Sequence, residues 1–467
     1  MAALSSLFDP DLLQRYDVPG PRYTSYPTAP QFTPGFGEAE LRQVAAASNG
    51  DPIPRPISLY LHIPFCTSPC FYCGCNRIIT RDKTRGAAYM TRLYREIAMA
   101  STLFDRDREV EQVHFGGGTP NFLDPDQIGE VVDVLRRHFS LARGSRLDCS
   151  IELDPRFITP EEVGRLAAAG FNRASLGVQD FDPVVQAAVN RVQGVEQTLA
   201  IIDACREHGF RSVNVDLIYG LPKQTLEGFS RTLDITLQAR PDRLAIYGYA
   251  HLPNLFRPQQ RIHAQDLPSA EQKLDLLRLA IERLGAAGYE YIGMDHFALP
   301  EDELARAQRE GGLHRNFMGY TTHAESDLVG LGVSAISHIG ASFSQNPRDI
   351  VGWEQAIDSG RLPVWRGMRL DEDDTIRADV IQQLMCHGML DFDALGSRHV
   401  IEFRDYFADA LRLLRPLQAD GLVEVDGQGL RATSRGRLLL RIIAMCFDRY
   451  LPTASDPATP PRYSRTV

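Results

Sequence analysis

The sequence predicts an α/β fold: a partial (β/α) barrel with an extended N-terminal arm and a smaller, mostly helical C-terminal domain. Between residues 58 and 249, short apolar runs alternate with helical segments. This alternation is typical of parallel strands joined by helical crossovers. After about residue 365 the pattern changes to helices and one hairpin. The length of 467 residues also exceeds what one hydrophobic core usually supports, so several domains are expected.

The N-terminal arm is expected over residues 1–50. Its segment 17–36 is rich in Pro, Tyr, Thr and Gly. These residues favour an extended course over a regular helix or strand. The simplest interpretation is a tail that lies on the surface.

The barrel domain is expected over residues 51–365. One of its helices begins with a capping-box pattern at Thr159, Pro160 and Glu162, and Gly170 is suited to end it. Barrels of this kind collect their active-site residues at the carboxyl ends of the strands. Strands are predicted at 58–63, 111–115, 147–153, 173–178, 212–218 and 243–249, and further helices at 87–103, 197–208 and 269–286.

The C-terminal domain is expected over residues 366–467. Helices are predicted at 371–386, 403–417 and 435–450, with a hairpin at 421–433. Helices combined with one hairpin resemble a small winged-helix-like module. Because the chain is acidic, a lid or packing role is favoured over DNA binding.

Charge and cysteine content restrict the classes of function. The net charge of −10 and a pI near 5.7 argue against a general nucleic-acid binder. No run of about 18 apolar residues predicts a membrane span, and the N-terminus lacks a signal-peptide pattern, so a cytoplasmic protein is expected. Four of the eight cysteines fall within ten residues. That distribution favours one metal or redox cluster over a disulfide framework.

The strongest motif is the loop that carries Cys66, Cys70, Cys73 and Cys75, directly after the first predicted strand. Thiolates bind iron–sulfur clusters and zinc. A structural zinc site usually uses two separated cysteine pairs, and no second pair is present here. Three cysteines on one tight loop can hold three irons of a cubane and leave the fourth iron open. Zinc binding, unliganded core cysteines and a fourth ligand at Cys75 remain the alternatives.

Other strand ends carry glycines or polar side chains. The run Gly-Gly-Gly-Thr-Pro at 116–120 follows the second strand, and such a run lets a backbone approach a ligand and offer it N–H groups. Glu152, Gln179, Arg191 and Asp216 follow later strands. Each of them could be a cap or part of a packing ion pair, and the glycine run alone could be a tight turn. Their shared position favours one site at the barrel mouth.

At the cysteine loop the sequence resembles the radical S-adenosylmethionine (SAM) superfamily. In that superfamily a C-x3-C-x2-C motif binds a 4Fe-4S cluster, and SAM chelates the unique iron. An aromatic residue before the last cysteine is typical, and Tyr72 occupies that place. The glycine run resembles the superfamily's motif for the amino group of SAM.

Further motifs narrow the resemblance to the family of oxygen-independent coproporphyrinogen III oxidases. They extend it over nearly the whole chain, from Arg22 to residue 451. The motifs are PRYTSYP (21–27), GVQDF (177–181), DLIYGLPKQT (216–225), YAHLP (249–253), GMDHFA (293–298) and HRNFMGYTT (314–322).

The resemblance implies the activity, the cofactors and the partners. The family converts coproporphyrinogen III to protoporphyrinogen IX without oxygen, by oxidative decarboxylation of two propionates through a 5′-deoxyadenosyl radical. It uses one 4Fe-4S cluster and two SAM molecules, and it requires an electron donor and an electron acceptor that the sequence does not identify. A monomer is expected.

The resemblance also assigns residues to roles. The cluster ligands fall on Cys66, Cys70 and Cys73, whereas Cys75 matches an extra cysteine that is not a ligand. Contacts to the cluster-bound SAM fall on Tyr60, Gly117, Glu152 and Ile336. Contacts to the second SAM fall on Tyr72, Gly118, Thr119, Gln179, Arg191, Asp216 and Ala250.

The substrate carries four carboxylates, so basic side chains are needed to bind it. The candidates are Arg22, Arg257, Arg261 and Arg315, any of which could instead be a surface charge. Arg22 and Tyr23 of the arm are also expected to reach the barrel mouth and to exclude water from the radical.

Three other functions share some of these sequence features. A haem-binding chaperone shares the barrel and the cysteine loop, but typically lacks the PRYTSYP arm and the cysteine at position 75. It also carries a Tyr-Trp pair where this sequence has no Trp after Tyr320. A radical SAM enzyme for another substrate and a zinc-binding structural protein are the remaining alternatives.

Overall fold

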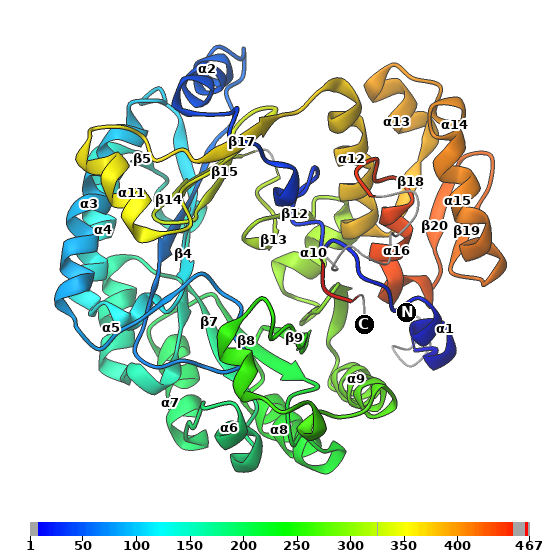
Figure 1. The fold of residues 1–467 in the computed structure, drawn as a ribbon, viewed down its shortest axis with the longest axis horizontal. Helices are drawn as coiled ribbons and strands as arrows, with labels where there is room; N and C mark the ends of the chain where they lie inside the picture. The colour runs from blue at the N-terminus through cyan, green and yellow to red at the C-terminus, as the bar shows by residue number, and fades with distance from the viewer. Residues whose placement is uncertain (1–7, 325, 452–462, 466–467) are drawn as a thin grey trace.

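The computed structural model describes residues 8–324, 326–451 and 463–465. It places a curved sheet with outer helices beside a C-terminal group of helices (Figure 1). None of the described helices has the length and apolarity needed to cross a bilayer. Residues 1–7, on which the expectation of no signal peptide partly rests, lie outside the described residues.

Seven parallel strands form the centre of the main sheet, in the order β14-β1-β4-β6-β7-β8-β9. Antiparallel strands extend both edges, β11 and β10 on one side and β15 to β17 on the other. The outermost strands β10 and β17 do not pair with each other, so the barrel is partial, as predicted. The strands are β1 (Ile57–Ile63), β4 (Glu109–Gly117), β6 (Asp148–Leu153), β7 (Arg173–Gln179), β8 (Ser212–Tyr219), β9 (Arg243–Gly248), β10 (Glu290–Gly293), β11 (His296–Ala298), β14 (Asp327–Leu331), β15 (Ile336–His338), β16 (Ser342–Gln345) and β17 (Arg366–Arg369); a short strand, β5 (Ser140–Leu141), pairs with β4.

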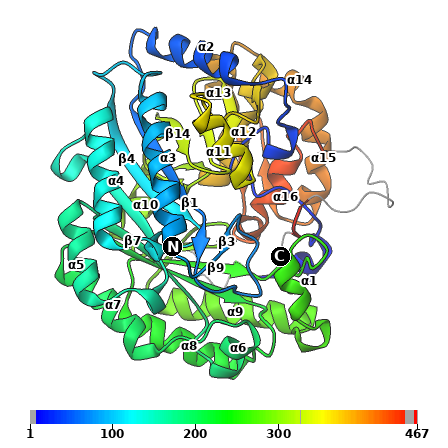
Figure 2. The same ribbon diagram turned by 60° about the vertical axis from the view of Figure 1, so that its left-hand side comes forward.

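Helices cover the outer face of this sheet (Figure 2). The capping box predicted at Thr159 is present, a second one at Ser269 begins the helix predicted from that residue, and Gly170 ends its helix in a left-handed conformation with φ 113°. The helices of this part are α3 (Thr84–Ser101), α4 (Pro125–His138), α5 (Pro160–Ala169), α6 (Pro183–Ala188), α7 (Val195–Glu207), α8 (Leu226–Ala239), α9 (Ala270–Ala286), α10 (Glu303–Glu310) and α11 (Ile350–Asp358).

The alternation of side chains along each strand separates the core from the site. In β7, Ala174, Leu176 and Val178 are buried in the hydrophobic core that the sheet shares with its outer helices. Ser175 and Gln179 alternate with them and point to the opposite face of the sheet, because successive strand residues point to opposite faces. The inner face is therefore available to polar groups.

The N-terminal arm does not lie on the surface, so that expectation is wrong. Figure 1 shows it running between the barrel and the C-terminal helices, from α2 (Glu38–Asn49) to α1 (Pro10–Arg15). Tyr23 and Tyr26 are 3% and 4% exposed and belong to the hydrophobic core of the C-terminal part. The aromatic residues of the arm are therefore core residues. The segment is extended as predicted, apart from a turn of 3-10 helix at Ala29–Gln31.

The C-terminal part contains helices and a three-stranded sheet, and two predicted helices are shorter than expected. The segment 403–417 divides at Phe407, whose ψ of 24° interrupts the helix while its ring packs on Phe403 and Phe447. The segment 435–450 contains only a 3-10 turn and α16. Its elements are α12 (Glu372–His387), α13 (Phe392–His399), α14 (Phe403–Tyr406), α15 (Ala408–Ala419), α16 (Leu440–Met445), β18 (Met389–Asp391), β19 (Val423–Val425) and β20 (Gly429–Ala432), and the last two form the predicted hairpin.

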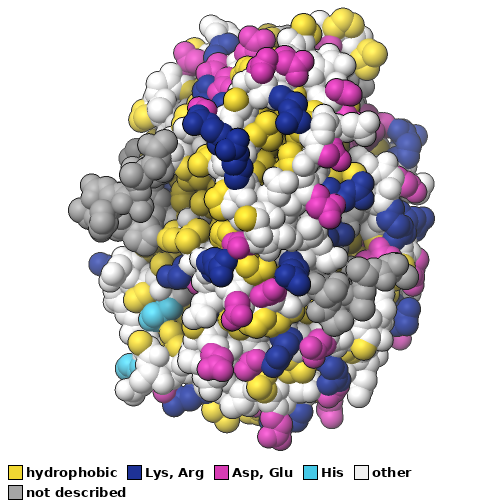
Figure 3. Space-filling view, turned by 90° about the vertical axis from the view of Figure 1, so that its right-hand side faces the viewer, with side chains coloured by type: hydrophobic (Ala, Val, Ile, Leu, Met, Phe, Trp, Pro, Cys, Tyr) yellow, Lys and Arg dark blue, Asp and Glu magenta, His cyan; other side chains and the backbone are white. Residues whose placement is uncertain are grey.

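The side of the molecule formed by this C-terminal part carries interspersed charges of both signs (Figure 3). A nucleic-acid-binding face would instead concentrate basic side chains along one element. The surface in this view is in keeping with the expected packing or lid role.

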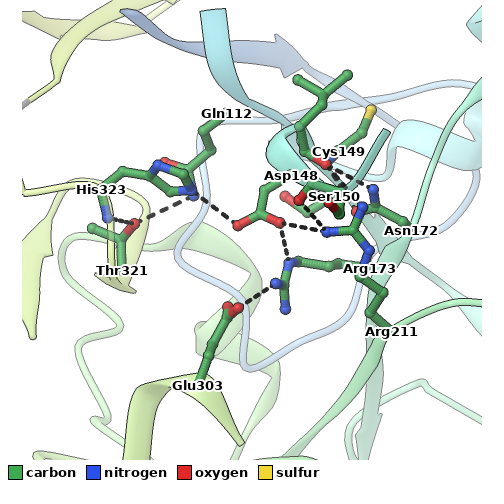
Figure 4. Close-up of polar contacts among 12 residues, drawn as sticks. Gln112, Asp148, Cys149, Ser150, Asn172, Arg173, Arg211, Glu303, Thr321 and His323 are labelled. Atoms are coloured by element: carbon green, nitrogen blue, oxygen red, sulfur yellow. Dashed lines mark hydrogen bonds and ion pairs between the residues drawn. The ribbon is translucent and has the colours of Figure 1, made fainter. Parts of the chain in front are cut away.

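An ion-pair network lies at the amino-terminal end of the strands (Figure 4). Asp148 at the start of β6 pairs with Arg173 at the start of β7 at 3.0 Å and with His323 Nε2 at 2.9 Å. Arg173 also pairs with Glu303 of α10 at 2.5 Å. The network joins elements far apart in sequence at the end of the barrel opposite the candidate site.

Candidate active site

The candidate site is a cavity of about 250 Å³ at the carboxyl ends of the parallel strands. The thiols of all three predicted cluster ligands line it together with most of the predicted SAM contacts. The predicted residues in its wall are Cys66, Cys70, Tyr72, Cys73, Gly117, Gly118, Thr119, Glu152, Gln179, Arg191 and Asp216.

The cysteine loop is held in place by backbone pairing. After β1, the short strand β2 (Phe65–Cys66) pairs in parallel with β3 (Ile78–Ile79). The amide of Thr80 donates to the carbonyl of Cys66 at 2.9 Å, which closes the loop between them. Cys66 and Cys70 are buried, Cys73 is half-buried and Cys75 is exposed. The three predicted ligands line the cavity, and so does the more exposed Cys75.

Positive charge surrounds the thiols. Arg191 and Arg156 donate to the Cys70 sulfur at 3.5 Å and 3.7 Å. A hydrogen bond from the Cys75 thiol, with a contribution from the charge of Arg77, lowers the pKa of the Cys73 thiol. Burial raises the pKa of Cys66 to about 11. Bound iron requires thiolates, and these guanidinium groups favour them.

Among the residues described, no three Cys, His, Asp or Glu side chains converge tightly enough to hold a single metal ion. The three predicted ligands line one cavity, and three cysteines in such a place suit the predicted four-iron cluster.

The glycine run closes on the backbone of the cysteine loop. The amide of Gly118 donates to the carbonyl of Ile63 at 2.8 Å. A Cβ at position 118 would lie 2.7 Å from the carbonyl group of Pro64. Gly117 has φ 116°, and a Cβ there would lie 2.7 Å from the ring of His62. Space and backbone conformation therefore both require glycine here.

Glu152 is oriented by its neighbours at the end of β6. Its carboxylate accepts from the amide of Gly117 at 3.2 Å and contacts His114 Nε2 at 3.3 Å. The ring of Tyr60 stacks on His114 with 5.9 Å between centroids. Tyr60 does not line the cavity wall itself, but it lies directly behind Glu152 in this arrangement.

Asp216 of β8 also lines the cavity. It accepts from Asn214 at 2.8 Å and from Ser175 at 3.2 Å. Burial raises the pKa of its carboxyl to about 6, and both hydrogen bonds oppose that rise. Near neutral pH this carboxylate is available as an acceptor for hydroxyl groups.

The two remaining predicted contacts, Ile336 and Ala250, are not among the residues that line the cavity. Tyr60 pairs with Gly330 across β1 and β14, and the backbone of Ile336 comes so close to Gly330 that a side chain there would clash. Ile336 is thus one strand away from Tyr60. Ala250 directly follows Tyr249, which shares a hydrophobic cluster with Tyr72.

Sequence reasoning missed Asp154 and Arg156. Asp154 forms ion pairs with Arg191 at 3.1 Å and with Arg156 at 2.7 Å, and all three side chains are largely buried. Asp154 therefore positions both guanidinium groups that contact Cys70. The signal was present, because Asp154 and Arg156 directly follow the strand that ends after Glu152.

The four candidate arginines differ in their exposure to solvent and in their ion pairs. Arg257 and Arg261 are exposed on a 3-10 turn outside the cysteine loop, where Arg261 stacks on Phe71. Arg315 is buried, and Arg22 forms an ion pair with Asp295 in the turn between β10 and β11. Arg22 therefore contacts the sheet of the barrel at this turn, whereas Tyr23, for which the same position at the barrel mouth was expected, belongs to the core of the C-terminal part.

Comparison with known proteins gives consistent matches along the chain. Residues 60–235 match the model of the radical SAM superfamily, and residues 370–439 match the model of the HemN C-terminal domain. The oxygen-independent coproporphyrinogen III oxidase of Pseudomonas aeruginosa is 52% identical over 98% of this chain and 99% of the relative. The Escherichia coli enzyme of the same name is 49% identical over 95% of this chain and 96% of the relative.

The solved structure of coproporphyrinogen III oxidase (HemN) from Escherichia coli, which its authors describe as a radical SAM enzyme, superimposes with a TM-score of 0.90. It is 48% identical, and the match covers 95% of this chain and 99% of that chain. Because relatives of this identity align along nearly its full length, the chain belongs to the family of oxygen-independent coproporphyrinogen III oxidases within the radical SAM superfamily.

Proposed function

We propose that this chain catalyses the oxygen-independent oxidative decarboxylation of two propionates of coproporphyrinogen III to vinyl groups. The product is protoporphyrinogen IX, an intermediate of haem biosynthesis. The observation that carries this proposal is the convergence of three loop thiols, a glycine run and Asp216 in one cavity, in a chain whose relatives bear the name of this enzyme.

The thiols of Cys66, Cys70 and Cys73 would hold a 4Fe-4S cluster, and their surroundings fit one. When bound, the cluster and SAM supply a 5′-deoxyadenosyl radical, which can remove hydrogen from a C–H bond that acid–base catalysis cannot activate. Arg191 and Arg156 stabilise the thiolate form of Cys70, and Asp154 fixes the direction of both guanidinium groups.

Two SAM molecules are part of the proposal. The backbone amides of the glycine run and the carboxylate of Glu152 are suited to the polar groups of the cluster-bound SAM, with Tyr60 and Ile336 behind them. Asp216 is suited to accept from ribose hydroxyls, and Arg191 is suited to a carboxylate. The second SAM would be bound by Tyr72, Gly118, Thr119, Gln179, Arg191, Asp216 and Ala250.

We propose a separate role for each of the three segments of the chain. Residues 51–365 bind the cofactors and the substrate, whereas residues 1–50 and 366–467 cover the site. The burial of Tyr23 against the C-terminal part, where its hydroxyl donates to Asp448 at 2.9 Å, supports the covering role. A covered site keeps water and other hydrogen donors away from the radical.

The partners and the compartment are also proposed. An electron donor would approach at the exposed rim of the cysteine loop near Cys75, and a separate acceptor takes the electron released with each CO2. All eight cysteines are unpaired, which supports a reducing compartment such as the cytoplasm. We propose a monomer as the working unit.

The test is an anaerobic assay on the reconstituted protein with SAM, a reductant, coproporphyrinogen III and a cell extract as the source of acceptor. Protoporphyrin and 5′-deoxyadenosine, measured by chromatography, are both expected. Formation of the cluster without decarboxylated product would contradict the proposal, and tight stoichiometric haem binding by the same sample would indicate a chaperone instead.

A further inference from the structure

Arg315 is a buried cation without an anion. It lies in β12 (His314–Asn316), is 5% exposed, and its Nε and Nη1 atoms have no hydrogen-bond partner among the residues that the structure describes. Its guanidinium carbon lies 4.7 Å from the ring centroid of Tyr320. No carboxylate of the described residues forms an ion pair with it. A buried charge without a counter-ion lowers the stability of the fold. An anionic ligand from outside the chain would compensate this charge.

A second buried nitrogen atom without a partner belongs to a side chain that contacts the same residue, Tyr320. The Nδ1 atom of His296 is buried without a hydrogen-bond partner. The His296 ring meets Tyr320 edge-on at 5.3 Å and Tyr247 at 6.0 Å. Arg22 lies over the other neighbour, 5.7 Å from the centroid of Tyr247. These side chains come from the arm, β9, β11, β12 and β13 (Gly319–Thr321), and they converge on one place.

The surroundings are more positive than the nearby carboxylates can balance. Arg22 is paired with Asp295, and within the described part of the chain Arg441 donates only to backbone carbonyls, such as that of Pro21 at 3.0 Å. Burial, with the charges of Arg315 and Arg22, lowers the pKa of His296. Burial and the same two charges lower the pKa of Arg441. The group accumulates positive charge inside a chain whose net charge is −10.

The aromatic side chains of this group, on one of which Arg315 packs, adjoin the candidate active site. His296, Tyr247 and Tyr320 line a cavity of about 180 Å³ inside the barrel. Glu152, Ser175 and Asp216 line both this cavity and the one that contains the cysteine loop. A ligand anchored beside Arg315 and a ligand bound at the cysteine loop would therefore meet at these shared residues.

We propose that Arg315 binds one propionate carboxylate of the porphyrinogen, with His296 Nδ1 as a second donor, and so fixes which face of the macrocycle meets the radical. The inference rests on the proposed function for the identity of the ligand. A carboxylate satisfies the free donors of the guanidinium and supplies the missing charge in one step. Arg257 and Arg261 lack this character because they are exposed to solvent.

The experiment measures porphyrin binding, not turnover. The variants are Arg315→Met and Arg315→Lys, with Arg412→Met as the control, because Arg412 is exposed on α15 and pairs only with Asp409. The probes are coproporphyrin III, a stable tetracarboxylate, and etioporphyrin III, which has the same macrocycle without carboxylates. Binding is followed by porphyrin fluorescence under anaerobic conditions.

Arg315→Met is expected to weaken coproporphyrin III binding on the order of 10- to 100-fold, since a hydrogen bond to a charged group is lost. Etioporphyrin III binding is expected to stay unchanged, Arg315→Lys to fall between, and Arg412→Met to match the unaltered protein. Equal weakening of both porphyrins, or unaltered coproporphyrin III binding in Arg315→Met, would overturn the proposal.

Thermal stability gives an independent readout. Removing an unpaired buried charge is expected to leave the Tm of the ligand-free protein unchanged or higher, whereas removing a structural arginine lowers it. A fall in Tm without selective loss of coproporphyrin III binding would assign Arg315 to the fold. Because binding is measured apart from turnover, selective loss in a protein that forms no protoporphyrin would sustain this inference and refute only the proposed activity.

Discussion

Gly118→Ala tests whether the glycine run serves the site through close packing. The added methyl group would lie 2.7 Å from the carbonyl carbon and oxygen of Pro64 and 2.9 Å from the carbonyl oxygen of Phe65. The Gly118 amide donates to Ile63 at 2.8 Å, so the residue cannot withdraw without breaking this hydrogen bond. The clash of the methyl group can therefore be relieved only if the segment that leads to Cys66 moves.

The magnitude follows from the type of contact. Overpacking against backbone costs about 1–3 kcal/mol, which lowers Tm by roughly 2–4 °C per kcal/mol in a domain of this kind. The loss of SAM affinity should be larger than the loss of stability suggests, because Thr119 lies 3.3 Å from the Cys66 sulfur and moves with Gly118. At least a tenfold weakening, or about 1.4 kcal/mol, is expected.

The assay combines iron and sulfide content after reconstitution, SAM affinity by calorimetry and Tm. Gly312→Ala is the matched control, because a methyl group there meets nothing within 4 Å. If Gly118→Ala binds iron and SAM as the unaltered protein does, with the same Tm, then close packing is not the reason for glycine at this position, and the structural reasoning is refuted.

Three further outcomes are expected. Cys70→Ser should lose the cluster and 5′-deoxyadenosine formation, whereas Cys446→Ser should keep both; equal iron content in the two variants would contradict the ligand assignment. Arg108→Met leaves the buried carboxylate of Asp327 without its ion-pair partner at 2.7 Å, so the free energy of unfolding should fall by about 3–5 kcal/mol, measured by denaturant titration. Burial lowers the pKa of the His323 ring, but the hydrogen bond to Asp148 in the network of Figure 4 and the charges of Asp148 and Glu111 together outweigh burial and raise the pKa above 6.5. Its stabilising contribution is thus full below pH 6.5 and is lost as the pH rises through the raised pKa, so His323→Gln should flatten the fall of Tm above pH 6.5; an unchanged slope would show that another group titrates there.

Much of the barrel and of the cofactor site could be predicted from the sequence. Strand and helix positions depend on local periodicity and on caps such as Thr159 and Ser269, and both appear in the structure. The cysteine loop and the glycine run are contiguous in sequence, so their chemistry can be read without a fold. Their meeting in one cavity follows from a general property of parallel sheets, whose carboxyl ends share an edge.

Contacts between distant segments could not be predicted in this way. The arm was expected on the surface, but Tyr23 is buried. This burial could not be predicted, because the partner of Tyr23, Asp448, lies 425 residues further along the chain. The helix expected at 403–417 divides because Phe407 packs on Phe447, a residue outside the segment.

Within the site, too, some features could be predicted from the sequence, whereas others depend on contacts between distant segments. The sequence alone predicted which residues would carry the iron–sulfur and SAM chemistry, from the spacing of the cysteines and from the family resemblance, and the structure brings most of these residues to one cavity. Only the tertiary structure decided between the four candidate arginines, since it buries Arg315 without a carboxylate and leaves Arg257 and Arg261 in solvent. The reason is physical: the free energy of a charge depends on its burial and on its partners, and both are set by segments far away in sequence.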